Sequence, residues 1–183
     1  LIDALQVHPT VGLVTPQILL WSEPNTINAC GNNIHVSGLG LCRGVGQPKD
    51  AFDETVIVPA VSGAGFVMQR DLFAELNGFD ADFFMYMEDT DLSWQAKLAG
   101  WDCLCVTQSV IYHHYVLRFG TKKVYYQERN RYLMLLKSLQ WRTLFSMLPI
   151  LFLTMVLLMK DEQLLPSIIQ VLPVRLNMEL ILL

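Results

Sequence analysis

The sequence predicts an α/β domain that is followed by a basic helix and an apolar helical tail. An amphipathic helix over residues 1–7 leads into an apolar strand at 11–14, and this order of elements is typical of an α/β sandwich. The 183 residues suffice for one domain with a sizeable core and an appendage. The mean hydropathy of +0.35 is high for a soluble domain, so we expect contact with lipid or with a large partner.

The remaining elements are bounded by glycine, proline and asparagine. Residues 25–53 are rich in glycine and asparagine without clear periodicity, which predicts a long surface excursion or a small hairpin. Gly78 and Gly100 are typical helix stops, so a short helix is expected before each of them. The other predicted elements are a strand at 56–61, helices at 70–77 and 90–99, strand-like pieces at 103–106 and 110–112, and a long helix at about 122–140.

Charged side chains divide the chain into three parts. Residues 1–117 carry 4 basic and 13 acidic side chains, residues 118–142 carry 7 and 1, and residues 143–183 carry 2 and 3. We therefore expect an acidic α/β part, a basic amphipathic helix and an apolar tail. The net charge of −4 argues against a nucleic-acid binder that relies on excess positive charge. The basic segment suits the anionic cytoplasmic surface of a cell membrane, and a solvated helix face is the alternative.

The tail begins with 17 uncharged residues between Arg142 and Lys160. As a helix this stretch would reach about 25 Å, against a bilayer hydrocarbon core of about 30 Å. Pro149 is expected to interrupt it, so a helical hairpin in one leaflet fits as well as a crossing. The prediction for residues 143–183 is membrane association with an open number of crossings. The alternative is a pair of helices buried against a partner subunit.

Three carboxylates, Glu88, Asp89 and Asp91, stand within four positions at a predicted helix start. Acidic residues there complement the helix dipole and cap free amides, which is the simpler structural explanation for any one of them. Three together exceed what a cap needs. Like charges this close usually persist because a cation, or a hydroxyl that gives up its proton, lies opposite.

Two further features accompany the acidic cluster. The loop Ser62-Gly63-Ala64-Gly65 follows a strand, and its glycines allow backbone amides to approach a ligand, although a tight turn explains it equally. The doublet His113-His114 also follows a strand. A histidine is commonly a hydrogen-bonded structural residue, but a neutral imidazole is also a ligand of divalent metals.

Residues 62–115 combine these features with further motifs. The additional motifs are Gly78-Phe79-Asp80, Phe83-Phe84, Tyr86, Leu92 after the acids, Ala99-Gly100, and Ile111-Tyr112 before the histidines. Together they resemble the C-terminal half of the catalytic domain of inverting family 2 glycosyltransferases. Downstream, Arg129-Asn130-Arg131 is similar to a helix of the bacterial rhamnosyltransferase-like members, which act in cell envelope polysaccharide biosynthesis. The resemblance covers roughly residues 1–140 and implies the C-terminal half of a GT-A, or nucleotide-diphospho-sugar transferase, fold.

The resemblance also implies roles for the acidic cluster and the histidines. Asp89 matches the general base, which would take the proton of an acceptor hydroxyl as sugar is transferred, with inversion, from a nucleotide-sugar donor. The acceptor would be a polysaccharide or a lipid-linked glycan. A divalent metal, Mg or Mn, would neutralise the diphosphate, and His113 matches a histidine that joins its coordination. His114 is the alternative ligand, because the doublet leaves the register ambiguous by one.

Other residues would support this chemistry. Glu88 and Asp91 would orient the base, hold the acceptor or cap the helix. The loop from Ser62 through Gly63 and Ala64 to Gly65 would line a substrate pocket through backbone groups. Trp94 is a candidate for stacking on a sugar face, as is Tyr86, although a core position is the simpler expectation for either.

One feature of the family is missing from this sequence. The family places a metal-binding Asp-x-Asp ahead of the glycine-rich loop, and residues 1–61 contain none. The chain also begins without Met. We therefore expect a fragment that lacks the donor pocket and is inactive alone, within a parent protein that is an enzyme.

Two other functions fit parts of the sequence. A metal-dependent hydrolase could use Glu88, Asp89, Asp91 and His113 around an activated water, but it leaves the glycine turn and the tail unexplained. A non-catalytic, membrane-associated assembly subunit could use the acids as helix caps only. The sequence does not specify the sugar, the acceptor hydroxyl or the oligomeric state.

Overall fold

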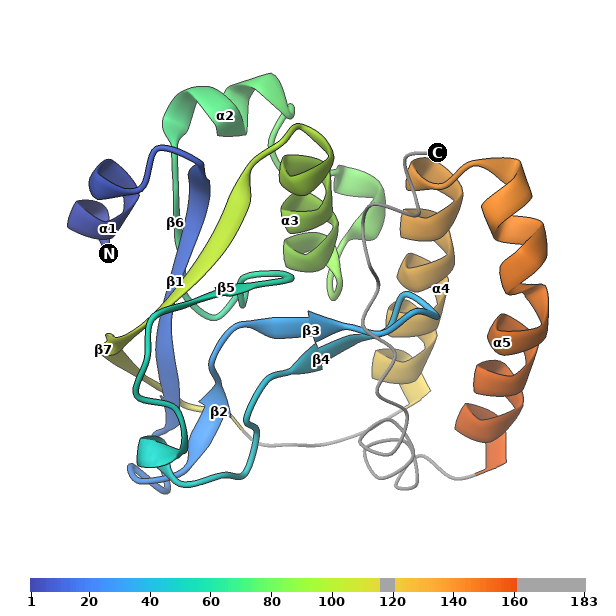
Figure 1. Ribbon diagram of the computed structural model, residues 1–183. Coiled ribbons are helices and arrows are strands. Elements are labelled where there is room, and N and C mark those ends of the chain that lie inside the picture. Colours follow the sequence, from blue (N-terminus) through green and yellow to red (C-terminus); the bar gives the residue numbers. More distant parts are fainter. Residues whose placement is uncertain (116–120, 161–183) are drawn as a thin grey trace. The chain divides into compact units, whose positions relative to one another are not determined.

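The computed structural model describes residues 1–115 and 121–160 and divides the chain into two compact units (Figure 1). The first unit comprises Leu1–Asn33 and Gly40–Arg118, and the second comprises Ile34–Leu39 and Phe119–Leu183. The second unit therefore includes a short stretch, residues 34–39, that lies within the first unit in sequence.

A mixed five-stranded sheet forms the centre of the first unit. Its order is β2-β1-β7-β5, and β6 pairs with β1. β1 (Val11–Leu20) runs parallel to β7 (Asp102–His113), and the other pairings are antiparallel. The remaining strands of this sheet are β2 (Ile27–Ala29), β5 (Val56–Val58) and β6 (Val67–Met68). Nine of the ten residues of β1 are buried, as expected for a strand inside a sheet with both faces covered.

Helices and a second small sheet complete the first unit. β3 (Asn32–Ile34) and β4 (Gly40–Cys42) form a two-stranded sheet within the glycine-rich excursion. The helical elements are α1 (Ile2–Val7), η1 (Lys49–Ala51), α2 (Arg70–Glu75), η2 (Ala81–Phe83) and α3 (Glu88–Leu98). The core between sheet and helices includes Leu13 of β1, Leu72 of α2, Leu92 of α3 and Cys103 of β7. This mixed α/β arrangement is consistent with a GT-A-like domain.

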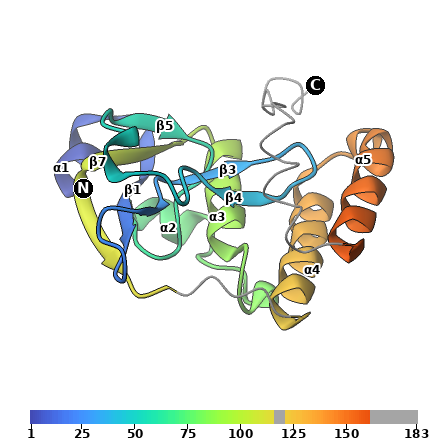
Figure 2. The same ribbon diagram turned by 90° about the horizontal axis from the view of Figure 1, so that it is seen from below.

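The second unit consists of two helices joined by a short connection, together with residues 34–39. α4 (Thr121–Ser138) and α5 (Trp141–Lys160) lie side by side in both views (Figures 1 and 2). Arg131 of α4 is 0% exposed. Its guanidinium forms a salt bridge with Glu128 and donates to the Ser37 carbonyl at 2.8 Å and to Oγ1 of Thr154 at 3.3 Å. One buried side chain therefore joins both helices to the 34–39 segment.

The structure corrects three details of the predicted elements. β1 continues through Pro16, where a register shift against β7 lets the strand tolerate a residue without an amide hydrogen. The two strand-like pieces at 103–112 form the single strand β7. α5 continues through Pro149, because buried Met147 and Leu151 pack the helix on both sides of the proline.

The apolar tail is only partly described. Within residues 1–115 and 121–160, no helix is both long enough and apolar enough to span a bilayer. Residues 163–174 are a further apolar stretch of the sequence and lie outside the described residues.

Candidate functional site

The glycine-rich loop is held at both ends by buried hydroxyl groups. At its start, the Val61 amide donates to Oγ of Ser93 on α3 at 3.2 Å, and that hydroxyl donates to the Asp89 carbonyl at 2.7 Å. At its end, Oγ1 of Thr15 on β1 donates to the Gly65 carbonyl at 2.8 Å. Ser93 and Thr15 are both 0% exposed. The loop is therefore fixed between the central strand and the first turn of α3.

The Asp89 carboxylate accepts four hydrogen bonds. Oδ2 accepts from the Gly63 amide at 2.6 Å and from Nδ2 of Asn32 at 3.4 Å. Oδ1 accepts from the Thr90 amide at 2.7 Å and from the Thr90 hydroxyl at 3.2 Å. Two of the four bonds are short and come from backbone amides, and two are long and come from side chains. The long bonds are the ones that an incoming hydroxyl can displace at least cost.

The Asp89 carboxylate closely approaches the backbone at Gly63. A Cβ atom there would lie 3.1 Å from Oδ2 of Asp89 and 3.3 Å from its Cβ. The φ angle of Gly63 is not positive, so the backbone itself would accept another residue. The close approach of the carboxylate, rather than turn geometry, therefore favours glycine at position 63.

Burial raises the pKa of both neighbouring carboxyls, Glu88 and Asp89. For Asp89 the burial outweighs the hydrogen bonds from Gly63 and Thr90, which lower the pKa. For Glu88 the adjacent Asp89 charge raises the pKa further, and Oε2 is buried without a hydrogen-bond partner. A carboxylate whose protonated form is favoured in this way is a better proton acceptor than an exposed aspartate.

The chain enters α3 through a strained segment. Phe84, Tyr86 and Met87 all have φ angles between 60° and 69°, a region that residues other than glycine rarely occupy. Phe84 is 70% exposed and Tyr86 is 36% exposed, directly before the acidic cluster. Such conformations cost roughly 1–3 kcal/mol each and gather at functional sites.

The other predicted site residues occupy different environments. Gly63 and Ala64 are exposed, whereas Ser62 is 8% exposed. Asp91 lies in the first turn of α3 and is 3% exposed, so its side chain is buried in the protein interior. Trp94 is 2% exposed, so neither face of its ring is open to a sugar and the side chain belongs to the core.

His113 ends β7 and is held by two neighbours. Its Nδ1 lies 2.9 Å from Oδ1 of Asn28, and its ring stacks on Tyr115 at 5.4 Å between centroids. With a carbonyl oxygen opposite Nδ1, a neutral ring carries its proton there and leaves Nε2 as the acceptor, which is the usual arrangement of metal-ligating histidines. His114 is exposed. The geometry fits His113 as one ligand.

A complete metal site does not form from the described part of the chain. Among those residues, no three His, Cys, Asp or Glu side chains gather in a way that could hold a metal ion. Asp89, which the hydrolase interpretation uses as a ligand, accepts N–H and O–H donors instead. Among the described residues, His113 is therefore the one predicted ligand whose geometry suits a divalent metal ion.

Sequence reasoning missed the residues that hold Asp89 and the glycine-rich loop in place. Asn32 lies in the asparagine-rich excursion, Thr15 in a buried strand and Ser93 on the buried face of α3. Thr15 and Ser93 lie in stretches that resemble the family, but nothing in the sequence marks these three residues as supports of the site. Asn32 is 7% exposed and is linked both to the Val61 carbonyl, at 3.0 Å, and to Asp89. Only the fold brings it to the carboxylate, across 57 positions of sequence.

Comparison with known proteins gives two findings. The family model described as "Glycosyl transferase family group 2" matches residues 3–182. The N-acetylglucosaminyl-diphospho-decaprenol L-rhamnosyltransferases of Mycobacterium tuberculosis strains CDC 1551 / Oshkosh and ATCC 25618 / H37Rv are each 39% identical to the chain over 54 residues. These matches cover 30% of this chain and 18% of each relative, so less than a fifth of the relatives' length is represented.

Proposed function

The chain belongs to the glycosyl transferase family group 2, and from this we propose that it forms part of an inverting sugar transferase whose general base is Asp89. The donor would be a nucleotide sugar. The acceptor would be a polysaccharide or a lipid-linked glycan, and the relatives' printed name, with its diphospho-decaprenol acceptor, supports the lipid-linked class. Membership in the family also favours transfer over the hydrolase alternative.

In the proposed reaction, a hydroxyl oxygen of the acceptor attacks the anomeric carbon of the donor sugar. The bond between that carbon and the diphosphate oxygen breaks as the new glycosidic bond forms on the opposite face. The hydroxyl proton passes to the Asp89 carboxylate, and the electron pair of the broken bond leaves with the nucleoside diphosphate. No covalent enzyme intermediate is needed.

The observation that carries the proposal is the setting of the Asp89 carboxylate. Its two short bonds come from the rigid backbone at Gly63 and Thr90, and they fix its orientation. Its two long bonds, from Asn32 and the Thr90 hydroxyl, leave capacity for an incoming O–H group. Burial raises its pKa, which strengthens it as a proton acceptor.

A divalent cation, Mg or Mn, belongs to the proposal as a cofactor. His113 would contribute Nε2 to its coordination, while Asn28 holds the ring through Nδ1. When bound, such a cation neutralises charge on the leaving diphosphate. The chain's own part is to orient that imidazole.

The proposed location is the cytoplasmic face of the cell membrane. The seven basic and one acidic side chains of residues 118–142 support it, since an anionic leaflet attracts such a segment. A lipid-linked acceptor would be presented at the same surface. This placement accounts for the high apolar content of the second unit.

The test is the Asp89→Asn variant in the longest polypeptide that contains this sequence, assayed for acceptor-dependent release of nucleoside diphosphate from a panel of nucleotide sugars. General-base loss should lower the transfer rate by about 10²- to 10⁴-fold. Asp91→Asn, at a buried position on the same helix turn, is the matched control and should lose far less. Unchanged transfer by Asp89→Asn would favour the non-catalytic assembly subunit.

A further inference from the structure

The second unit carries an exposed apolar stripe along α5. Trp141 is 69% exposed, Phe145 66%, Leu148 54% and Phe152 66%. Their spacing of four, three and four residues places them on one face of the helix. A separate stripe of α5, Leu144, Met147, Leu151 and Thr154, is buried. The helix therefore has one apolar face for its own unit and a second apolar face that is exposed.

The exposed stripe borders a groove that continues onto α4. The groove has a volume of about 430 Å³, and its lining is apolar apart from the tyrosine. The α4 side chains that line it are Tyr132, Leu135 and Leu136. The hydrogen bond between Arg131 and Thr154 shows that the two helices run antiparallel, because the short connection at 139–140 lies at the other end. The apolar surface is thus continuous over two helices.

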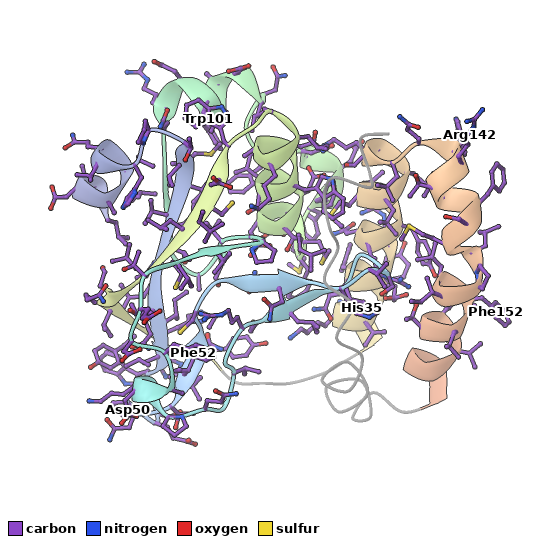
Figure 3. All side chains as sticks on the ribbon, viewed as in Figure 1. His35, Asp50, Phe52, Trp101, Arg142 and Phe152 are labelled. Atoms are coloured by element: carbon purple, nitrogen blue, oxygen red, sulfur yellow. The ribbon has the colours of Figure 1, made fainter. Side chains whose placement is uncertain are left out.

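Basic side chains lie beyond both ends of this surface. Near the helix connection are Lys137 and Arg142, both exposed, and Arg142 is seen at the start of α5, with Phe152 further along it, in Figure 3. Toward the start of α4, Lys122 and Arg129 are exposed and share the helix face of Tyr132 by three- and seven-residue spacing. Between residues 121 and 160 the one acidic side chain is Glu128, which is bound to Arg131.

We propose that this face of the second unit, the exposed stripe of α5 with its groove and flanking cations, lies flat on an anionic lipid surface. Aromatic and aliphatic side chains would enter the boundary between headgroups and acyl chains, and the cations would reach the phosphates on either side. In this arrangement α5 lies in the plane of the surface.

The charge distribution favours lipid over the other occupants. A second copy docking through the same face would bring two basic surfaces of like sign together. A partner protein would need an acidic rim around an apolar ridge, whereas an anionic bilayer supplies both phosphates and apolar chains. The inference deepens the proposed membrane location and rests on it, but not on the sugar chemistry.

The experiment is co-sedimentation of the 183-residue chain with vesicles of phosphatidylcholine and phosphatidylglycerol, and with vesicles of phosphatidylcholine alone. We expect the chain to bind the anionic vesicles and the fluorescence of Trp141 to shift to the blue on binding. The Trp141→Phe variant should still bind but should lack this blue shift. The double variant Phe145→Ser/Phe152→Ser should bind at least about tenfold more weakly, because it removes two aromatic rings that would enter the lipid. Lys137→Gln and Arg142→Gln should each weaken binding about fivefold, and on anionic vesicles only.

The matched control is Ile57→Ser/Val110→Ser, which removes two exposed apolar side chains of the first unit, 60% and 42% exposed, and should bind like the parent chain. Equal binding by the Phe145→Ser/Phe152→Ser variant would overturn the proposal, because the lipid contact would then lie elsewhere in the chain. The proposal would also be overturned if the parent chain did not bind the anionic vesicles. A third contrary outcome would be a concentration-dependent dimer of the parent chain, seen by light scattering, that the Phe145→Ser/Phe152→Ser variant no longer forms. The same double variant in the longest polypeptide that contains this sequence should transfer sugar to a soluble acceptor at the parent rate, so that failure of the lipid contact and failure of the sugar chemistry are distinguishable.

Discussion

The backbone amide of Gly63 lies 2.6 Å from Oδ2 of Asp89, and a single added methyl group at Gly63 would lie 3.1 Å from the same oxygen. The glycine-rich loop and the acidic cluster are therefore one arrangement rather than two motifs. The backbone conformation at Gly63 would accept alanine, but the added methyl group would be in tight contact with the carboxylate, which would have to shift by a few tenths of an ångström.

Gly63→Ala, in the longest polypeptide that contains this sequence, should reduce sugar transfer while leaving the fold nearly intact. The new methyl pushes the carboxylate by a few tenths of an ångström against its short hydrogen bond, so the loss of rate should stay below the roughly 10²-fold that a misplacement of about 1 Å can cost. Gly46→Ala is the control, since Gly46 has a φ of 78° and nothing within 4 Å. It should lose about 1 kcal/mol of stability but no activity. The check is transfer rate and urea unfolding of both variants; full activity of Gly63→Ala would contradict the geometry.

The Asn32 side chain should set the pH dependence of transfer. Because burial raises the pKa of Asp89 above the ordinary value of 3.8, the rate should fall on acidification at a pH above that value. Asn32→Ala removes one donor to the carboxylate, so the pKa should rise further and the acid limb should move to higher pH. The exposed neighbour Asn33 provides the control, Asn33→Ala. If the two variants had the same pH–rate profile, Asn32 would not influence the pKa of the general base.

Glu88→Gln should stabilise the protein at neutral pH. The folded-state pKa of Glu88 is raised by burial, so the unfolded chain ionises first, and stability falls as pH rises through 4.5 toward the folded-state pKa. Glutamine removes that loss. The gain in the free energy of unfolding should therefore be near zero at about pH 4 and positive at about pH 7, in denaturant titrations. If the gain in the free energy of unfolding were largest at acidic pH, the pKa of Glu88 would not be raised by folding.

Arg131→Met should destabilise the second unit by roughly 3 kcal/mol, because it breaks a buried ion pair and removes the donor of the Ser37 carbonyl. Arg131→Lys should not restore the loss, since an ammonium cannot reproduce the fork that reaches Glu128, Ser37 and Thr154. Thermal unfolding provides the measurement, with the exposed Arg129→Ala as the control, expected within about 1 kcal/mol. Equal losses in the two positions would contradict a structural role specific to Arg131.

His113→Gln should raise the concentration of Mg or Mn that half-saturates transfer, and His114→Gln should not. The reason is that Asn28 and Tyr115 hold the His113 ring in one orientation, whereas His114 is exposed. The measurement is a metal titration after removal of divalent ions with a chelator. The opposite order of effects would assign the ligand to the second histidine, and no dependence on added metal would end the cofactor proposal.

Local sequence signals predicted much of the fold because they depend on neighbouring residues. Gly78 and Gly100 end helical segments, and the helix at 122–140 differs from α4 by one or two residues at each end. β6 escaped prediction because it has two residues and exists only through its pairing with β1. The prediction that Pro149 interrupts the helix was wrong. Helix propensity depends on the residue alone, and the packing of the buried face of α5 outweighed it.

The motifs of the candidate site could be predicted from the sequence, but the residues that hydrogen-bond to these motifs and hold them in place could not. The acidic cluster and the glycine loop are visible as short strings, and each is ambiguous by itself. The contact that relates them spans 26 positions, and the bond from Asn32 spans 57. Such distances depend on how the sheet brings strands together, which single-residue patterns do not encode.

Residues 34–39, which comprise the last residue of β3 and its connection to β4, belong to the second unit, so the polypeptide passes from one unit to the other three times. A recombinant product that stops after residue 118 would keep this hexapeptide but lose Arg131, which binds its Ser37 carbonyl, and Leu135, whose side chain lies 3.0 Å from a Cβ built on Gly38. Anyone shortening the gene for crystallisation or labelling therefore does better to replace 34–39 with a two-residue hairpin turn at the same time, or to leave both regions in place.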